Sequence, residues 1–264
     1  GLTDSQSAAY GAVLGAITGD AAGGVLEFLG YPPSAAEVQH AMAMPGGGVF
    51  DLAPGQFTDD GEMTAALLGV LSSSNNQYQD AGVAAAYGIW ADSRPFDMGQ
   101  ATARALLRLK TTNKAREARG RALSENAESK ANGSLMRATP LGIIAVSLSE
   151  VASANIAARD SSLTHPNASC KFAVAAYVLA IRHLVRSPGD NQGALIAARA
   201  YLEVTQSEVV EWLDEAIQGY LPPATPLIGF VRIAFAHAFY QLSVGSPYDH
   251  AIKAVLSLGG DTDT

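Results

Sequence analysis

Two short acidic segments carry the residues of this chain that are best suited to chemistry. The first, residues 55–62, reads GQFTDDGE, and the second, residues 259–264, reads GGDTDT. Each combines two carboxylates with a threonine hydroxyl beside glycine, and neither offers sulfur or imidazole. Mg²⁺ and Mn²⁺ prefer oxygen ligands of this kind. If folding brings the two segments together, the sequence predicts a site for a hard divalent cation.

A simpler interpretation exists for each segment taken alone. Asp59 has the features of a helix N-cap, and Glu62, three residues later, would complete a capping box. Asp261 and Asp263 could belong to a polar tail. However, Gly259 and the glycine after it follow an apolar helical pattern directly, which indicates a tight turn. The pairing of two such segments in one acidic chain favours metal binding over capping.

Composition limits the class of protein. The chain has 264 residues, of which 48% are hydrophobic and 16% charged, so we expect a folded globular protein. A net charge of −8 opposes binding to nucleic acid. The single cysteine, Cys170, cannot form an internal disulfide, and we expect a cytoplasmic protein. The longest apolar run, Phe172 to Ile181, is shorter than the roughly 20 residues that cross a bilayer, so it predicts a buried helix and no membrane span.

Hydrophobic periodicity predicts an all-α fold. No segment alternates apolar and polar residues in the way of a strand, whereas apolar residues recur at helical spacing along most of the chain. Residues 29–57 are expected to form a long loop, and residues 110–131 a polar surface segment of mixed helix and loop. The expected helices cover residues 11–28, 63–71, 83–90, 101–109, a segment capped by Thr139 and opened by Pro140, the apolar run after Asn167, and residues 191–204, 208–219, 226–243 and 248–258.

Six motifs, taken in order, resemble those of the ADP-ribosylglycohydrolases, and most closely the dinitrogenase reductase-activating subgroup. They are Gly19-Asp20 with Glu27-Phe28, Gly55 to Asp60, Phe96-Asp97-Met98-Gly99, Asn132 to Arg137, Thr164-His165-Pro166, and Gly259 to Thr264. Together they span essentially the whole chain, which makes the resemblance more specific than any one motif.

The resemblance implies one domain over residues 1–264, an orthogonal helical bundle with two Mg²⁺ or Mn²⁺ ions in a cleft. It assigns Thr58, Asp59 and Asp60 to one ion, Asp261 and Thr264 to the other, and Asp263 as a bridge between them. It places Glu27, Asp97 and Asp60 in the catalytic centre. It assigns substrate binding to Asn132, Gly133, Ser134, Met136 and His165.

The implied activity is hydrolysis of the glycosidic bond between ADP-ribose and a protein side chain, with arginine as the favoured acceptor. The implied ligands are ADP-ribosylated protein or ADP-ribose, and we expect a monomer. One alternative is a hydrolase of free derivatives such as O-acetyl-ADP-ribose. Another is a non-catalytic binding or crystallin-like structural protein, against which the full set of aspartates and Glu27 argues.

Some residues remain open or depart from the resemblance. Arg137 could pair with a phosphate or brace an acidic side chain inside the fold. His183, His237 and His250 are interpreted as structural. Family chains continue past the last motif into a further helix, which is absent after Thr264 here. A larger polar residue is frequent at the position of Gly61, and glycine is expected to loosen the helix start there without removing a ligand.

Overall fold

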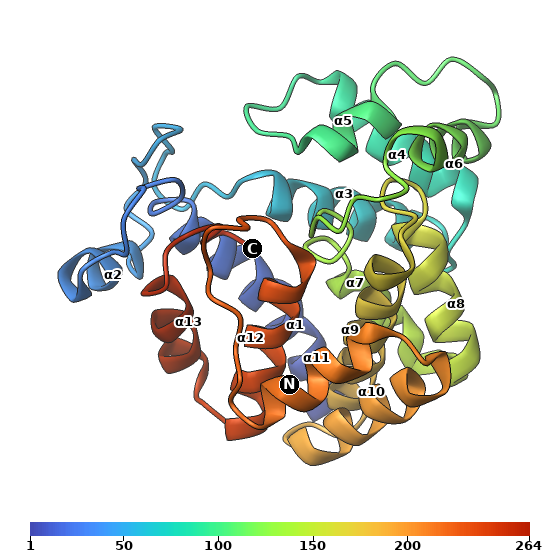
Figure 1. Ribbon diagram of the computed structural model, residues 1–264. Coiled ribbons are helices and arrows are strands. Elements are labelled where there is room, and N and C mark those ends of the chain that lie inside the picture. The colour runs from blue at the N-terminus through green and yellow to red at the C-terminus, as the bar shows by residue number, and fades with distance from the viewer.

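Helix α9 (Ala168–Arg186) lies at the centre of a fold made only of helices (Figure 1). The computed structural model describes residues 1–264 and contains no named strand. The other elements are α1 (Asp4–Gly23), α2 (Ala35–Ala41), α3 (Asp59–Ser73), α4 (Asp80–Asp92), α5 (Gln100–Leu106), α6 (Lys114–Glu125), α7 (Thr139–Ile144), the 3₁₀ helix η1 (Ala145–Ser147), α8 (Glu150–Ser161), α10 (Asn191–Thr205), α11 (Glu208–Ile217), α12 (Val231–Val244) and α13 (Tyr248–Leu256). The predicted all-α single-domain architecture is confirmed.

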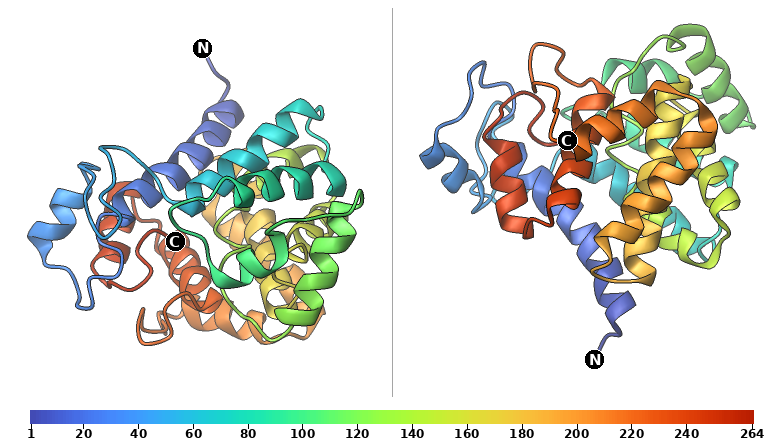
Figure 2. Two further views of the ribbon diagram at one scale, coloured as in Figure 1. Left: turned by 90° about the horizontal axis from the view of Figure 1, so that it is seen from above. Right: turned by 60° about the horizontal axis from the view of Figure 1, so that its bottom comes forward.

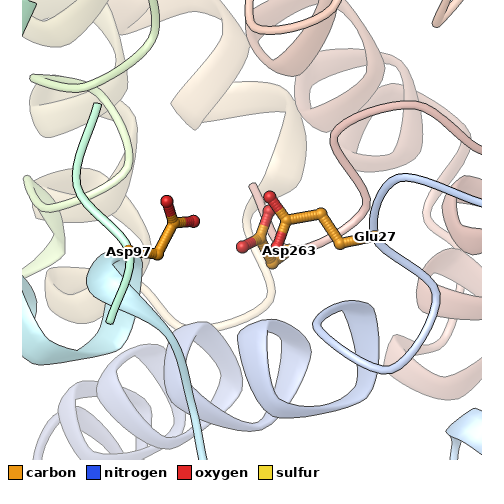
Figure 3. Close-up of side chains that lie close together, drawn as sticks. All are labelled: Glu27, Asp97 and Asp263. Carbon is orange, nitrogen blue, oxygen red and sulfur yellow. The ribbon is translucent and has the colours of Figure 1, made fainter. Parts of the chain in front are cut away.

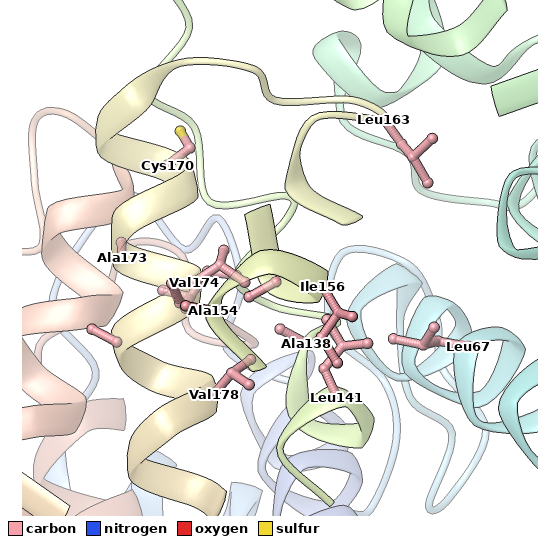
Figure 4. Packing of buried hydrophobic residues seen from close by; sticks show 14 of the residues in the cluster. Leu67, Ala138, Leu141, Ala154, Ile156, Leu163, Cys170, Ala173, Val174 and Val178 are labelled. Atoms are coloured by element: carbon pink, nitrogen blue, oxygen red, sulfur yellow. The ribbon is translucent and has the colours of Figure 1, made fainter. Parts of the chain in front are cut away.

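The core forms around α9 because small and branched apolar residues alternate along that helix. Ala173, Val174 and Val178 are fully buried and pack with residues of α3, α7 and α8 (Figure 4). Alanine at the contact points lets α9 approach α7, α8 and α10 closely. By length and composition α9 could also cross a membrane, but 61% of its most apolar part is buried inside the protein, as in the core helix of a soluble protein. The prediction of a buried helix at Phe172–Ile181 is therefore confirmed.

The C-terminal segment of the chain crosses the C-terminal end of α1. The hydroxyl of Thr262 donates a hydrogen bond to the carbonyl of Gly23 at 2.7 Å. A side chain at Gly23 would place its Cβ 2.0 Å from the Thr262 carbonyl oxygen, so only glycine permits this crossing. Figure 2 shows the C-terminus in the middle of the molecule while the N-terminal end of α1 projects outward. The crossing is what brings residues 259–264 to the start of α3.

Several predicted boundaries differ from the structure. Helix α1 covers Asp4–Gly23 rather than residues 11–28, and Thr3 and Gln6 form its capping box. The expected loop 29–57 contains the short helix α2. Helix α8 was not among the predicted segments, and α12 begins at Val231 rather than at residue 226. The segment 110–131 is confirmed as a helix, α6, with flanking loops.

The predicted N-cap of α7 is wrong, and the alternative of a cap at Asp59 is not observed. The N-cap of α3 is Thr58 and not Asp59, and Glu62 accepts a hydrogen bond from the Trp90 indole at 2.7 Å instead of closing a capping box. Likewise α7 has Ala138 as its N-cap, and the Thr139 hydroxyl lies 2.7 Å from that of Tyr177. In both cases a tertiary partner has taken the side chain that the local pattern assigned to the backbone.

Candidate metal centre and cleft

Asp20, from the buried end of α1, organises the start of α3. Its carboxylate accepts hydrogen bonds from the backbone N–H groups of Thr58 and Gly61 at 2.7–3.0 Å, and from the Thr58 hydroxyl at 2.7 Å. Burial raises the pKa of Asp20 to about 6, although these hydrogen bonds favour the ionised form. Asp20 thus does from a distance what a local N-cap side chain would do, and leaves Asp59 and Asp60 free to face away from the helix.

Gly61 is required by this arrangement. A Cβ at this position would lie 2.8 Å from an Asp20 carboxylate oxygen and 2.6 Å from the Phe57 ring. The expectation that glycine loosens the helix start is therefore wrong, because the absence of a side chain is what lets Asp20 reach the Gly61 N–H group.

Asp59 and Asp60, at the start of α3, meet Asp263 from the C-terminal segment. One carboxylate oxygen from each lies within 4.8 Å of the others, and all three residues are buried. Asp263 also belongs to a second group with the same spacing, formed with Glu27 and Asp97. Figure 3 shows Glu27 and Asp97 approaching Asp263 from opposite sides. Asp263 therefore belongs to both carboxylate triads. Its expected role as a bridge between two ions stays a prediction.

The remaining predicted ligands lie at the edges of these triads. The Thr58 hydroxyl is 2.8 Å from Asp263, and the Thr264 hydroxyl donates to Asp60 at 2.7 Å. Asp261 accepts a hydrogen bond from the Asn132 amide at 2.7 Å and lies outside both triads. The structure thus gathers the six predicted ligands in one place, while Thr264 contacts Asp60 rather than being grouped with Asp261.

No cation of the protein balances this charge. None of the carboxylates in the two triads forms an ion pair with lysine, arginine or histidine. Burial, followed by the neighbouring acidic groups, raises the pKa of Asp59 to about 7, and that of Glu27 to about 8. Burial and the other carboxylates also raise the pKa of Asp60 and Asp263 well above the ordinary range.

Two buried oxygens in these triads have no hydrogen-bond partner, Oε2 of Glu27 and Oδ1 of Asp263. Unpartnered buried carboxylate oxygens are costly unless a cation or a donor reaches them. All the available donor atoms are oxygen, the preference of Mg²⁺ and Mn²⁺. The residues present therefore fit hard divalent cations, on the chemistry of the donors and on these unpartnered atoms.

The triads line a cleft with a volume of about 430 Å³. This is within the range of about 300–1,000 Å³ that is typical of small-molecule sites. The rest of the lining, which we call the neutral wall, includes Asn132, Gly133, Met136, His165 and Gly229. Asp261 borders it through the hydrogen bond from the Asn132 amide. The cleft is therefore most anionic at the triads and less so along the neutral wall.

The predicted substrate residues are not all equally available. Asn132, Gly133, Met136 and His165 line the cleft, whereas Ser134 is fully buried, and its hydroxyl lies 2.8 Å from that of Ser161. Burial, with a smaller effect of Arg137, lowers the pKa of His165 to about 3, so its imidazole is neutral at pH 7. His165 can thus offer this wall a neutral ring but no positive charge.

Arg137 braces the fold and does not reach the cleft. It is completely buried and pairs with Asp160 at 3.0 Å, while its guanidinium carbon lies 4.5 Å from the centre of the Tyr87 ring. Arg137 also donates to the Thr164 hydroxyl at 2.8 Å, which lies 2.7 Å from Nδ1 of His165. Of the two interpretations left open by the sequence, the structural brace is the one observed.

The sequence profile of the ADP-ribosylglycohydrolases matches residues 2–264, that is, nearly the whole chain. The chain belongs to the ADP-ribosylglycohydrolase family. A solved structure described as an ADP-ribosylglycohydrolase-related protein complex has the same fold, with a TM-score of 0.76, 24% sequence identity, and coverage of 100% of this chain and 84% of the other.

Curated relatives include ADP-ribosyl glycohydrolase enzymes. A putative ADP-ribosyl glycohydrolase, L543, of Acanthamoeba polyphaga mimivirus is 28% identical over 97% of this chain and 82% of its own length. The ADP-ribosyl-[dinitrogen reductase] glycohydrolase of Rhodospirillum rubrum is 37% identical over 38% of this chain and 34% of its own length. The ADP-ribosylarginine hydrolase Tri1 of Pseudomonas putida (strain GB-1) is 34% identical over 54% of this chain and 38% of its own length.

Two residues that matter for this family member's site carried no assigned role in the sequence analysis. Asp20 positions Thr58 and Gly61, and Gly23 admits the C-terminal segment. Asp20 stands in one of the motifs that carry the resemblance, so the motif was a signal, but its partner lies 38 residues away. Gly23 had no signal, since its role depends on a crossing that no local pattern encodes.

Proposed function

We propose that this chain is a Mg²⁺- or Mn²⁺-dependent hydrolase that releases ADP-ribose from arginine side chains of proteins. The observation that carries the proposal is the pair of carboxylate triads, buried except for the half-buried Asp97, joined at Asp263 and open to a cleft without any compensating cation. Such a concentration of negative charge is unfavourable for an empty fold and useful for a site that binds divalent cations.

In this proposal Thr58, Asp59 and Asp60 would hold one cation, Asp261 and Thr264 would hold a second, and Asp263 would serve both. Two cations so held would orient a water molecule and the ribose diol, and would stabilise negative charge near the reacting carbon. Asp20 supports the set from behind, because it fixes the backbone from which Asp59 and Asp60 project. Partners of this kind orient the ligand residues.

Glu27 and Asp97 act on the reacting bond from the sides of the cleft. Hydrolysis breaks the bond between the anomeric carbon and the guanidine nitrogen, joins a water oxygen to that carbon, and returns a proton to the guanidine. Cations bound beside Glu27 would favour its ionised form, and its unpartnered Oε2 would then be able to accept the proton of the attacking water. Asp97, which lies opposite, can stabilise the positive charge that develops on the ribose and the departing guanidine.

The diphosphate of ADP-ribose belongs at the neutral wall. Phosphate oxygens would be repelled by the triads, whereas the segment starting at Asn132 and Gly133 presents peptide groups and an amide. The buried ion pair of Arg137 with Asp160 holds this segment rigid from below. The substrate is therefore expected to lie across the cleft with its ribose at the carboxylates and its phosphates at residues 132–133.

Arginine is the proposed acceptor because relatives named for ADP-ribosylarginine and for dinitrogen reductase match this chain at 34% and 37% identity. Free derivatives such as O-acetyl-ADP-ribose present the same ribose and diphosphate without a guanidine. They are therefore the comparison substrates, and non-catalytic binding of ADP-ribose is the other outcome to be tested.

The test is to incubate the protein with ADP-ribosyl-arginine and with O-acetyl-ADP-ribose, in Mg²⁺, Mn²⁺ or EDTA, and to measure ADP-ribose release. We expect release from ADP-ribosyl-arginine only with metal, and a loss of about 10²–10³-fold in kcat for Asp60→Asn, comparable to losing one strong electrostatic contributor. Asp4→Asn, which removes an exposed carboxylate at the outer end of α1, is the matched control. Turnover that is equal in Asp60→Asn and wild type, or calorimetric binding of ADP-ribose without turnover, would contradict the proposal.

A further inference from the structure

Three phenylalanines from three separate loops pack together at the rim of the cleft. The rings of Phe28 and Phe50 are edge to face, with centroids 6.3 Å apart, and those of Phe50 and Phe96 are tilted at 5.2 Å. Phe28 lines the cleft and directly follows Glu27, while Phe96 directly precedes Asp97. The aromatic rim, as we call these three residues, thus stands beside both carboxylates that flank Asp263.

The rim is not held in place by burial. The exposed fraction is 52% for Phe28 and 42% for Phe96, although large apolar side chains gain most when water is excluded from them. Phe28 also has a backbone φ of 59°, a left-handed conformation that costs a non-glycine residue of order 1–3 kcal/mol. A fold that keeps an exposed aromatic ring on a strained backbone is presenting that ring to a partner.

The proposed orientation of the substrate in the cleft indicates which group contacts the aromatic rim. In the proposed binding mode the diphosphate lies away from the triad carboxylates, along the neutral wall formed by residues that include Asn132 and Gly133. The group attached to the other side of the ribose must then leave the cleft past Glu27 and Asp97. A protein side chain has to enter from solvent, and the solvent-exposed edge beside these two residues is the aromatic rim.

A guanidinium suits this position better than any other acceptor. It is planar and positively charged, so it can stack on an aromatic face and pair with a carboxylate at the same time. A serine hydroxyl or an acetyl group has neither the charge nor the flat face that the rim and the carboxylates would recognise. The aromatic rim and the adjacent carboxylates are therefore complementary to arginine in shape and in charge.

We propose that Phe28 and Phe96 determine specificity for an arginine acceptor by stacking on its guanidinium, and that Phe50 holds the two rings in place. This inference rests on the proposed function of the same cleft, and it adds residues that select the acceptor rather than bind ADP-ribose. The stacking acts on the leaving side of the scissile bond and leaves the rest of the substrate untouched.

The test compares Phe28→Leu and Phe96→Leu with Phe28→Tyr and Phe96→Tyr. Leucine keeps apolar volume and removes the aromatic face, whereas tyrosine keeps that face. For the leucine variants we expect KM for ADP-ribosyl-arginine to rise about 3- to 30-fold, the range of a cation–π contact at a partly desolvated site. The inhibition constant of ADP-ribose should stay unchanged, and the tyrosine variants should resemble wild type. Tyr10→Leu, on the exposed N-terminal half of α1, is the control for loss of a surface ring.

Thermal unfolding of each variant separates a binding effect from a folding defect. If the leucine variants weaken ADP-ribose inhibition as much as they raise KM, the rim contacts ADP-ribose or only joins the loops, and the inference is overturned. Unchanged KM in both leucine variants would overturn it equally. If wild type releases no ADP-ribose, the proposed function fails, and calorimetry then tests the inference separately. Tighter binding of ADP-ribosyl-arginine than of ADP-ribose, with the difference abolished in Phe28→Leu, supports the role of the aromatic rim. Equal binding of the two ligands overturns it.

Discussion

Two buried polar clusters lie at opposite ends of the segment from Asn132 to Arg137, and they are built in opposite ways. At one end Asp160 receives Arg137 at 3.0 Å and the hydroxyls of Tyr87 and Tyr78 at 2.8 and 3.1 Å. At the other end Asn132 touches Asp261, beside triads of carboxylates that have no cation. The first cluster has a partner for each charge, and the second is a set of ligands without one.

The comparison distinguishes a structural role from a functional role in two clusters that both contain carboxylates. A buried ion pair with complete hydrogen bonding fixes its surroundings, and removal of one member leaves an uncompensated charge. Carboxylates that are clustered without a counter-charge lower the stability of the fold and create affinity for a cation. The segment between the clusters is therefore held at its Arg137 end, while its Asn132 end lines the cleft.

The largest effect is expected from breaking the satisfied cluster. Asp160→Asn leaves the buried Arg137 guanidinium without a counter-charge, and should lower the free energy of unfolding by about 3–5 kcal/mol in urea titrations. Asp214→Asn is the matched control, because Asp214 pairs with Arg199 at 2.8 Å where both side chains are more than a third exposed. A pair of that kind contributes about 0–1 kcal/mol. Equal losses in the two variants would contradict the contrast.

Metal should supply what the unsatisfied cluster lacks. At a free Mn²⁺ concentration of 100 times Kd we expect the free energy of unfolding to rise by about 2.7 kcal/mol relative to EDTA. For a domain of this size that corresponds to an increase in Tm of roughly 5–10 °C. Differential scanning calorimetry measures the shift. Asp263→Asn, which removes the carboxylate shared by both triads, should abolish most of it, and an undiminished shift in that variant would place the metal elsewhere.

The crossing of the C-terminal segment over the end of α1 can be tested at Gly23. Gly23→Ala places a Cβ 2.0 Å from a backbone oxygen of Thr262, so the C-terminal segment has to move. We expect a loss of about 1–3 kcal/mol in unfolding free energy, as for other overpacked sites, together with a smaller shift on adding Mn²⁺. Gly11→Ala, on the same helix with no neighbouring atom within 4 Å, is the control and should gain up to about 1 kcal/mol. Similar behaviour of the two variants would show that the crossing does not position Asp263.

Periodicity in the sequence was enough to predict most helices, because the apolar stripes of α3 and α9 to α11 arise from burial of one face. It failed at the end of α1, where a run of alanine and glycine has no local stop signal and the contact of Gly23 with Thr262 marks the boundary. It failed again at Thr139, whose hydroxyl meets that of Tyr177 at 2.7 Å instead of capping α7. Both failures have one cause, a partner that is distant in the chain.

The residues of the site could be predicted from the sequence, but the hydrogen bonds that connect them could not. Acidic motifs and their order identified the carboxylates that the structure brings together around Asp263. Their roles in binding and catalysis remain predictions. Sequence patterns could not show that Asp20 caps α3, or that the Ser134 hydroxyl is turned towards Ser161 inside the fold. Side-chain direction depends on packing, which the spacing of residues does not encode.

The smallest expected effect is that of Asp60→Asn on the free energy of unfolding. It is the most informative about the two clusters, because its sign should differ between EDTA and Mn²⁺. In EDTA, Asp60→Asn removes one charge from a group of buried carboxylates while keeping the side chain's size and most of its hydrogen-bonding capacity. Two like charges about 5 Å apart repel by roughly 3 kcal/mol at an effective dielectric constant of about 20, and partial protonation already relieves some of this. We therefore expect a gain of about 1 kcal/mol in the free energy of unfolding without metal. With Mn²⁺ the order should invert, and wild type should be the more stable, since only its carboxylates bind the ion fully. Urea titrations of both proteins in EDTA and in Mn²⁺ give the four values needed. A loss of stability for Asp60→Asn in EDTA, like the loss expected for Asp160→Asn, would mean that the triads stabilise the fold as a structural network. The lack of a cation among their carboxylates would then not be evidence of metal binding.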